Sequence, residues 1–161
     1  GGEKREIALL LHDIRSVYNV GAIFRTADAI GASKIYITGY TPAPLDRFNN
    51  PRADLAKSAL GSEKTMPWKY AKSPAKVIAD LKKKGFQIIS LEQTDDSVDY
   101  KKVKPAAKAL VVFGNEISGV SRSIIERSDI VAEIPMRGGK ESLNVSVSAG
   151  ITLFRWFDRR S

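Results

Sequence analysis

Three short loops in the last third of the chain carry the polar, proline and glycine residues that best suit a binding site. They span residues 114–119, 134–139 and 142–146, and the first two follow short apolar runs. The third loop opens a long helical pattern. Loops that follow parallel strands collect at one edge of a sheet, where α/β proteins bind ligands. The spacing therefore predicts a small-molecule pocket near residues 114–146.

The common nucleotide and hydrolase motifs do not explain these loops. Gly114 and Gly119 have the first spacing of a P-loop, but Val120 and Ser121 stand where a lysine and a Ser or Thr must hold the phosphates. Neither Gly-x-Gly-x-x-Gly nor Gly-x-Ser-x-Gly occurs, which argues against a dinucleotide site and a triad hydrolase. The only histidine, His12, is interpreted as structural, and no Asp, Glu and His cluster has metal-ligand spacing.

Residues 138–140 (Gly-Gly-Lys) precede the last predicted helix and have two interpretations. Their backbone N–H groups could cradle an anion at the start of that helix, where the helix dipole favours negative charge. A flexible basic turn explains the same residues equally well. The sequence leaves both interpretations open.

The composition bounds the class of protein. A chain of 161 residues that is 43% hydrophobic and 27% charged suits one soluble globular domain. No apolar run approaches 18 residues, so no membrane span is expected. The chain begins with Gly1-Gly2 and no Met, which is interpreted as the scar of a removed tag. The absence of cysteine excludes disulfides and thiolate-bound zinc and fits a cytoplasmic protein. A net charge of +8 favours a polyanionic partner, although solubility alone would also explain it.

Hydrophobic periodicity predicts that strands and helices alternate along the chain. Strands are expected at 6–11, 33–38, 86–91, 109–113 and 130–134, and helices at 19–30, 52–60, 74–84, 122–127 and 143–159. Residues 39–51 are rich in Pro and Asn and predict a long loop. The alternation predicts a single α/β domain over residues 1–161, with a mostly parallel sheet flanked by helices.

The first predicted helix carries an arginine that the core does not need. Val20, Phe24 and Ala27 form the apolar stripe of this helix, and Arg25 faces away from that stripe. An exposed helical arginine is most often a solvated surface charge. Arg25 therefore becomes informative only together with the residues around it and with the three later loops.

Four segments, in this order, carry a family resemblance. They are residues 19–26 (Asn-Val-Gly-Ala-Ile-Phe-Arg-Thr), 113–116 (Phe-Gly-Asn-Glu), 134–136 (Ile-Pro-Met) and 142–146 (Ser-Leu-Asn-Val-Ser). Together they resemble the three signature motifs of the SpoU (TrmH-like) family of the SPOUT superfamily, the RNA ribose 2′-O-methyltransferases. Each motif is weak singly, but in order they are specific. The resemblance covers nearly the whole chain.

The resemblance implies a fold, a cofactor and an assembly. The C-terminal part of the α/β sheet would thread into a deep trefoil knot, an exception to the rule that folds are unknotted. S-adenosylmethionine would sit in the knotted loops, and similar proteins are homodimers in which the arginine of one subunit reaches the cofactor of the other. The residues that would bind the cofactor are Leu91, Glu92, Gly114, Glu116, Ile134, Met136, Leu143 and Asn144.

The resemblance also implies a polar catalytic group. Its members would be Asn19, Arg25, Glu116, Ser142 and Asn144. Because a ribose 2′-hydroxyl is a very weak acid and a guanidinium keeps its proton, we expect Arg25 to stabilise the oxyanion instead of acting as a base. We expect Glu116 to orient either Arg25 or Asn19. No metal is needed, since the sulfonium of the cofactor is already an activated methyl donor.

The expected substrate is transfer or ribosomal RNA, and the sequence does not choose between them. One alternative function is a non-catalytic RNA-binding module that keeps the knot; the intact set of Asn19, Arg25, Glu116 and Asn144 argues against it. A second alternative is a knotted methyltransferase that acts on a base, which only product analysis distinguishes.

Overall fold

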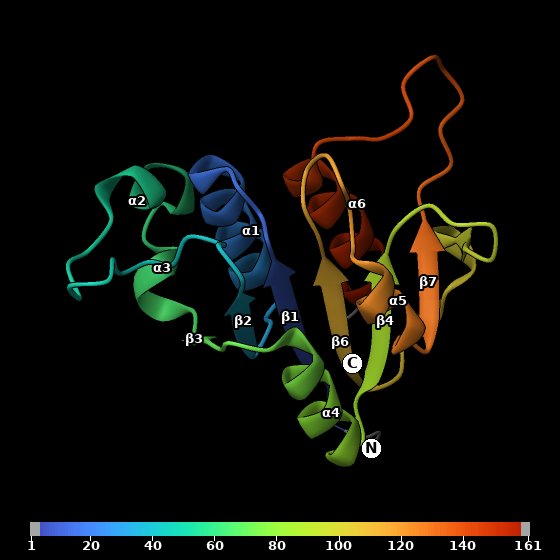
Figure 1. Ribbon diagram of the computed structural model, residues 1–161, viewed down its shortest axis with the longest axis horizontal. Helices are drawn as coiled ribbons and strands as arrows, with labels where there is room; N and C mark the ends of the chain where they lie inside the picture. The colour runs from blue at the N-terminus through green and yellow to red at the C-terminus, as the bar shows by residue number, and fades with distance from the viewer. Residues whose placement is uncertain (1–3, 159–161) are drawn as a thin grey trace.

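A parallel sheet of seven strands forms the centre of the protein, as the computed structural model shows for residues 4–158 (Figure 1). The elements are, in chain order, β1 (Glu6–His12), α1 (Val17–Ala29), β2 (Lys34–Thr38), α2 (Ala53–Ala59), α3 (Ser62–Thr65), β3 (Trp68–Tyr70), α4 (Pro74–Lys83), β4 (Gln87–Leu91), β5 (Val98–Asp99), the 3-10 helix η1 (Tyr100–Lys102), β6 (Lys108–Phe113), α5 (Arg122–Glu126), β7 (Ile130–Glu133) and α6 (Val145–Phe157). The strand order is β3-β2-β1-β6-β4-β7-β5, and every pair is parallel. The predicted α/β class is confirmed.

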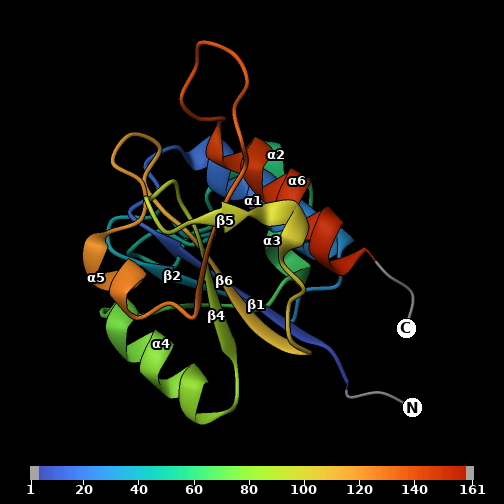
Figure 2. The same ribbon diagram turned by 90° about the vertical axis from the view of Figure 1, so that its right-hand side faces the viewer.

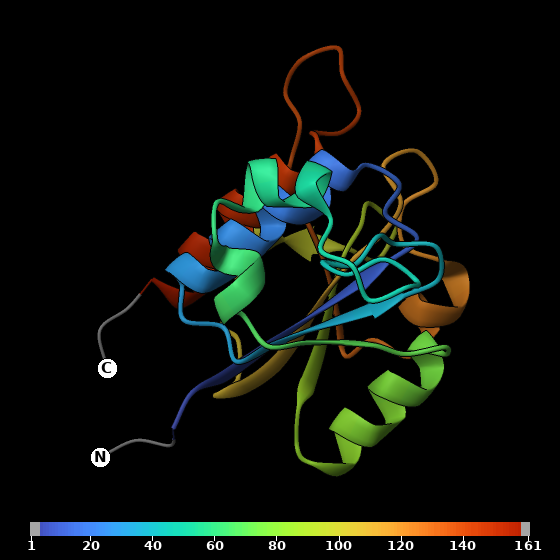
Figure 3. The ribbon, with the colours of Figure 1, turned by 90° about the vertical axis from the view of Figure 1, so that its left-hand side faces the viewer.

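Helices cover both faces of this sheet. The helices α1, α2 and α6 pack on one face, and α4 and α5 pack on the other (Figures 2 and 3). Strand β1 serves both layers, because Ile7, Leu9 and Leu11 face the first group of helices while Ala8 and Leu10 face the second. All five side chains are at most 3% exposed. A strand buried on both faces is what a central position in a parallel sheet requires.

The helix that carries Arg25 begins two residues earlier than predicted. Ser16 is the N-cap of α1, and its Oγ accepts a hydrogen bond from the Asn19 N–H at 3.2 Å. The helix therefore starts at Val17, and Asn19 lies inside its first turn. The predicted start at Asn19 is wrong because the cap and its hydrogen bond precede the first apolar residues of the stripe.

The last helix also begins at a cap residue. Asn144 is the N-cap of α6, and its Oδ1 accepts a hydrogen bond from the Ser146 N–H at 2.8 Å. The helix thus starts at Val145 instead of Leu143. This start lies several residues beyond Lys140, so residues 138–140 do not form the helix terminus that the anion-cradle interpretation needs, and that interpretation is wrong. The helix ends at Phe157, with Asp158 as its C-cap, two residues before the predicted end. The interpreted tag scar at residues 1–2 lies outside the described residues.

Four short elements were not predicted: α3, β3, β5 and η1. Strand β3 extends the sheet beyond β2, and the two-residue β5 extends it beyond β7. Elements of two to four residues are too short to show a periodicity in the sequence. Their positions depend on pairing with strands that are distant in the chain.

The C-terminal strands are not arranged in chain order. Strand β7 lies between β4 and β5, although both precede it in the chain. The helix before β7, α5, packs on one face of the sheet, and the helix after it, α6, packs on the other. Figure 2 shows β5 and η1 beside α6, where the Trp156 Nε1–H donates to the Tyr100 carbonyl oxygen at 2.8 Å. Threading through a knot would need such an insertion; the knot itself stays a prediction.

The described part of the chain lacks two further features. Among residues 4–158, no helix has both the length and the apolar character needed to cross a membrane. In the same residues, no group of three or more His, Cys, Asp and Glu side chains could hold a metal ion.

Candidate active site

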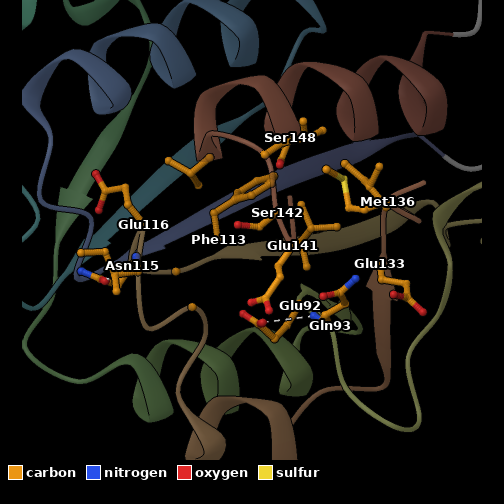
Figure 4. Close-up of a pocket in the computed structure, with 17 residues that line it drawn as sticks. Glu92, Gln93, Phe113, Asn115, Glu116, Glu133, Met136, Glu141, Ser142 and Ser148 are labelled. Atoms are coloured by element: carbon orange, nitrogen blue, oxygen red, sulfur yellow. Dashed lines mark hydrogen bonds between the residues drawn. The ribbon is translucent and has the colours of Figure 1, made fainter. Parts of the chain in front are cut away.

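A cavity of about 220 Å³ lies at the carboxyl ends of β4, β6 and β7 (Figure 4). It is formed where the three loops of the last third of the chain meet the segment that follows β4. The lining residues are Leu91, Glu92, Gln93, Phe113, Gly114, Asn115, Glu116, Ile117, Gly119, Glu133, Ile134, Met136, Glu141, Ser142, Leu143, Val145 and Ser148. Parallel strands bring these segments together because their carboxyl ends meet at one edge of the sheet.

The charge of this lining is opposite to the charge of the chain. Four of the lining residues are the glutamates Glu92, Glu116, Glu133 and Glu141. No lining residue is Lys, Arg or His. The whole chain nevertheless has a net charge of +8. An acidic cavity favours a cationic ligand and repels phosphate groups. The cavity is thus better suited to a cation than to a nucleotide.

Glu116 connects the loop after β6 to the start of α1. Its Oε1 accepts a hydrogen bond from the Arg15 N–H at 2.9 Å, and its Oε2 accepts from the Ser16 N–H at 2.8 Å. The Asn19 Nδ2 donates a third hydrogen bond to Oε2 at 3.1 Å. Asn19 is only 4% exposed, so this amide is held between the helix and the loop. Of the two predicted partners of Glu116, the structure places Asn19 against it.

The hydrogen bonds at Glu116 also set its protonation state. Burial, the largest single influence, raises the pKa of this carboxyl, but the hydrogen bonds from Arg15, Ser16 and Asn19 act together in the opposite direction. The resulting pKa lies below the ordinary value of 4.5. Glu116 is therefore ionised at neutral pH and is a poor proton acceptor.

The turn that carries Glu116 is closed by its own hydrogen bonds. The N–H groups of Asn115 and Gly119 each donate to the carbonyl oxygen of the other, at 3.1 and 2.9 Å. The Asn115 Oδ1 accepts from the Ile117 and Ser118 N–H groups at 2.8 and 2.9 Å. A Cβ at Gly114 would collide with the Gly119 carbonyl. Only glycine at position 114 lets the two ends of the turn come this close.

Glu92 ties the segment after β4 to the same turn. Its Oε2 accepts a hydrogen bond from the Val120 N–H at 2.9 Å, and its Oε1 accepts from the Gln93 N–H at 3.1 Å. Gly119 has a φ of +73°, and a Cβ there would strike the Glu92 carboxylate. Glu92 therefore contributes to the shape of the cavity as well as to its charge.

The structure gathers most of the predicted cofactor-binding residues around the cavity. Seven of the eight line it: Leu91, Glu92, Gly114, Glu116, Ile134, Met136 and Leu143. Asn144 does not line the cavity, because its side chain caps α6 and is hydrogen-bonded to Ser146. All of the predicted cofactor-binding residues except Asn144, the N-cap of α6, therefore lie at the cavity.

The predicted catalytic group is divided between two places. Glu116 and Ser142 line the cavity, and Asn19 joins them through its hydrogen bond to Glu116. Arg25 lies elsewhere, in a groove between α1, α2 and the end of α6. It is exposed there, and among residues 4–158 it forms no salt bridge. Within one chain, Arg25 does not reach the cavity.

Apolar side chains surround Arg25 in this groove, which we call the Arg25 groove. Its lining residues are Tyr18, Ala22, Arg25, Thr26, Ala29, Lys57, Ser58, Leu60 and Phe154. Tyr18 is 67% exposed, Leu60 is 64% exposed and Phe154 is 43% exposed. Large apolar side chains exposed side by side are typical of surfaces that contact a partner or a ligand.

Several residues of the site were missed by the sequence interpretation. The backbone N–H groups of Arg15 and Ser16 hold Glu116, and the Asn115 side chain closes its turn. The one available signal was Ser16, a residue type that commonly caps helices. Backbone donors carry no sequence signature, so only the fold could reveal them.

Comparisons with known proteins identify the family of this chain. A model of the SpoU rRNA Methylase family matches residues 6–154. The 23S rRNA (guanosine-2′-O-)-methyltransferase RlmB of Neisseria meningitidis is 36% identical over 91% of this chain and 56% of that protein. The tRNA (guanosine(18)-2′-O)-methyltransferase of Aquifex aeolicus is 33% identical over 94% of this chain and 70% of that protein.

A solved structure supports the same assignment. The AdoMet-bound rRNA methyltransferase from Sinorhizobium meliloti superposes with a TM-score of 0.84 and 28% identity over 95% of this chain. The present chain covers 56% of that structure and 56% of the Neisseria protein, little more than half of each. The family model covers nearly all of the present chain. This chain therefore belongs to the SpoU rRNA methylase family.

Proposed function

We propose that this chain transfers the methyl group of S-adenosylmethionine to the 2′-hydroxyl of a ribose in transfer or ribosomal RNA. The observation that carries the proposal is an acidic cavity in a strongly basic chain. S-adenosylmethionine is a cation and suits the carboxylate lining, whereas RNA is a polyanion and suits the rest of the molecule. The names of the two relatives, one an rRNA enzyme and the other a tRNA enzyme, support both RNA classes.

The cavity residues fit this cofactor in chemistry as well as in charge. Leu91, Ile134 and Leu143 offer apolar contacts for a flat base, and the carboxylates offer acceptors for hydroxyl and ammonium groups. Gly114 lets the turn after β6 close tightly at the edge of the cavity, because a Cβ there would collide with the Gly119 backbone. The bound cofactor would supply an activated methyl group, so the chain itself must only position the ribose and stabilise charge.

Arg25 and Glu116 have different roles in this proposal. Arg25 stabilises the oxyanion that forms as the hydroxyl loses its proton, because a guanidinium offers several N–H donors and a fixed charge. Glu116 holds Asn19 and the start of α1 in place, since its oxygens are occupied and its low pKa makes it a poor base. Ser142 completes the polar side of the cavity. The proton leaves to water or to an RNA phosphate.

A homodimer would bring these groups together. We propose that the Arg25 groove of one subunit packs against the other, so that Arg25 enters the acidic cavity of its neighbour. Three properties of one chain support this assembly: the apolar groove is exposed, Arg25 forms no salt bridge among residues 4–158, and the cavity has no basic lining residue. The opposite charges of the two surfaces are complementary.

The same proposal includes the trefoil knot and a cytoplasmic site of action. The insertion of β7 between β4 and β5 supports the knot, since the strand lies between two strands that are consecutive in the chain. The bacterial relatives modify ribosomal and transfer RNA, by their names, and these RNAs function in the cytoplasm. Residues 1–161 would then act as one methyltransferase domain.

Replacing Arg25 tests the proposed chemistry. We expect Arg25→Ala to slow methyl incorporation into RNA by about 100-fold or more, while calorimetry shows S-adenosylmethionine binding within about threefold of wild type. Arg122→Ala is the matched control, because the Arg122 side chain is 92% exposed on α5, on the opposite face of the sheet. Normal turnover by Arg25→Ala with normal cofactor binding would remove Arg25 from the mechanism.

A further inference from the structure

Two exposed tyrosines lie along the same edge of the sheet as the cavity, outside its lining. Tyr40 follows β2 and is 60% exposed, and Tyr70 ends β3 and is 49% exposed. Figure 3 shows the segment that follows β2 on the side of the molecule where the loop after β6 also emerges. Neither ring is needed by the hydrophobic core.

Tyr40 is fixed at both ends and connected directly to the loop of the candidate active site. Its backbone N–H donates to the Asp13 Oδ1 at 3.1 Å, and its hydroxyl accepts a hydrogen bond from the Asn115 Nδ2 at 2.8 Å. Asn115 is the neighbour of Glu116 in the chain. The ring is therefore held beside the catalytic loop although its surface remains open to solvent.

Tyr70 continues the same line of rings away from the cavity. Its hydroxyl donates to the Gly39 carbonyl oxygen at 3.3 Å, and Gly39 immediately precedes Tyr40. Because the sheet order runs β3-β2-β1-β6, the two tyrosines and Asn115 follow one another along the carboxyl edge. Lys72, two residues after Tyr70, is exposed and can neutralise a phosphate.

We infer that Tyr40 and Tyr70 form a stacking track for unpaired RNA bases next to the nucleotide that is methylated. This inference rests on the proposed function and adds that the substrate is single-stranded where it crosses β1 to β3. Bases stack on exposed aromatic rings without regard to their identity, whereas a duplex hides the faces of its bases. The hydroxyl hydrogen bonds fix both rings, so little side-chain freedom is lost on binding.

Binding of a short RNA tests the track without requiring methylation. The probe is an oligouridylate of about 12 nucleotides with one central 2-aminopurine, used as a single strand and as a duplex with its complement. We expect Tyr40→Ala to weaken single-strand binding by about 5- to 150-fold and to leave duplex binding unchanged. Tyr40→Phe keeps the ring and should lose less single-strand affinity than Tyr40→Ala. Tyr70→Ala should also weaken single-strand binding.

Phe48→Ala is the matched control, because Phe48 is a similarly exposed aromatic ring (69%) that lies in the loop of residues 39–51 with the Arg47 guanidinium over it. We expect this variant to bind within about threefold of wild type, and thermal melts will show that all variants fold. The track is wrong if Tyr40→Ala and Tyr70→Ala both bind the single strand with wild-type affinity. It is also wrong if Phe48→Ala loses as much single-strand affinity as Tyr40→Ala, or if Tyr40→Ala weakens duplex binding as much as single-strand binding. A chain that binds the strand through Tyr40 but never methylates RNA would contradict the proposed function alone.

Discussion

Glu116 accepts hydrogen bonds from two backbone N–H groups and from the Asn19 amide. At the residue scale, this arrangement explains why a carboxylate at the centre of the site acts through position and charge. Its three donors belong to the start of α1, so Glu116 joins the loop after β6 to the first helix across about a hundred residues of chain. The proton of the ribose hydroxyl must therefore go elsewhere.

The low pKa of Glu116 predicts a pH-dependent contribution to stability. Its folded-state pKa lies below the ordinary 4.5, so the ionised carboxylate stabilises the fold above that pH, and the contribution is lost as the pH falls through the folded-state pKa. At pH about 7, we expect Glu116→Gln to lower the melting temperature by about 2–8 °C. This difference should shrink toward zero in acid.

Melting curves across acidic and neutral pH measure this difference. Glu126→Gln is the control, because Glu126 forms only an exposed pair with Arg122 and should shift the melting temperature by about 1 °C or less. A Glu116→Gln difference that stays constant from neutral to strongly acidic pH would show that the carboxylate charge does not stabilise the start of α1.

At the element scale, the site depends on how closely the turn after β6 is folded. Gly114 begins that turn, and a Cβ there would lie 2.6 Å from the Val120 nitrogen and still closer to the Gly119 backbone. The neighbouring atoms are backbone, which cannot rotate away as a side chain can. The turn, the cavity and the hydrogen bond from Val120 to Glu92 must therefore shift together.

Gly114→Ala should consequently affect both stability and cofactor binding. We expect a loss of about 1–3 kcal/mol in the free energy of unfolding and S-adenosylmethionine binding weakened about tenfold or more. Gly138→Ala is the matched control, since nothing lies within 4 Å of the Cβ position and its φ is not positive. Denaturant unfolding and calorimetry measure the two effects. Equal behaviour of both variants would mean that the turn tolerates a side chain.

The long elements could be predicted from the sequence because they carry a clear pattern. The apolar runs of β1 and β6 and the stripe of α1 gave their positions directly. The two-residue β5 gave no pattern, and nothing in the sequence indicates that Leu60, a residue other than glycine, ends α2 in the left-handed conformation. The sequence also placed the three loops at one site. It could not place Tyr40 against Asn115, because a contact across 75 residues depends on strand order.

At the scale of the whole molecule, charge is distributed in a way that a single chain does not explain. The cavity gathers carboxylates, while Arg25 and Lys57 lie in the Arg25 groove among exposed apolar side chains. An active site that needs Arg25 is incomplete in one chain. A symmetric dimer would complete two such sites at once, because each subunit would give its arginine and receive another.

Mixing two inactive variants tests this exchange. Arg25→Ala and Glu116→Ala should each be inactive alone, yet the mixed dimer contains one site with both groups intact. We expect an equal mixture to recover about a quarter of wild-type methyl transfer. Recovery is absent if each subunit uses its own Arg25. The control is Arg122→Ala mixed with Glu116→Ala. It shows how much methyl transfer remains when an active variant is mixed with an equal amount of the inactive Glu116→Ala chain.

The apolar part of the Arg25 groove should hold the dimer together. Phe154 is 43% exposed and lies in this groove, so Phe154→Glu places a charge in the proposed interface. We expect the variant to be monomeric by light scattering and to lose methyl transfer, while cofactor binding stays within about threefold of wild type. A dimer that persists in Phe154→Glu would place the interface elsewhere.

The identity of the methylated nucleoside tests whether the chain methylates the ribose of RNA. The chain is incubated with RNA and with S-adenosylmethionine carrying a deuterated methyl group, and the RNA is then digested to nucleosides and analysed by mass spectrometry. A ribose methyltransferase places the label on the sugar, so that loss of the base from the labelled nucleoside leaves the label behind. We expect a labelled 2′-O-methylnucleoside that is absent with Arg25→Ala. A label that leaves with the base would contradict the account.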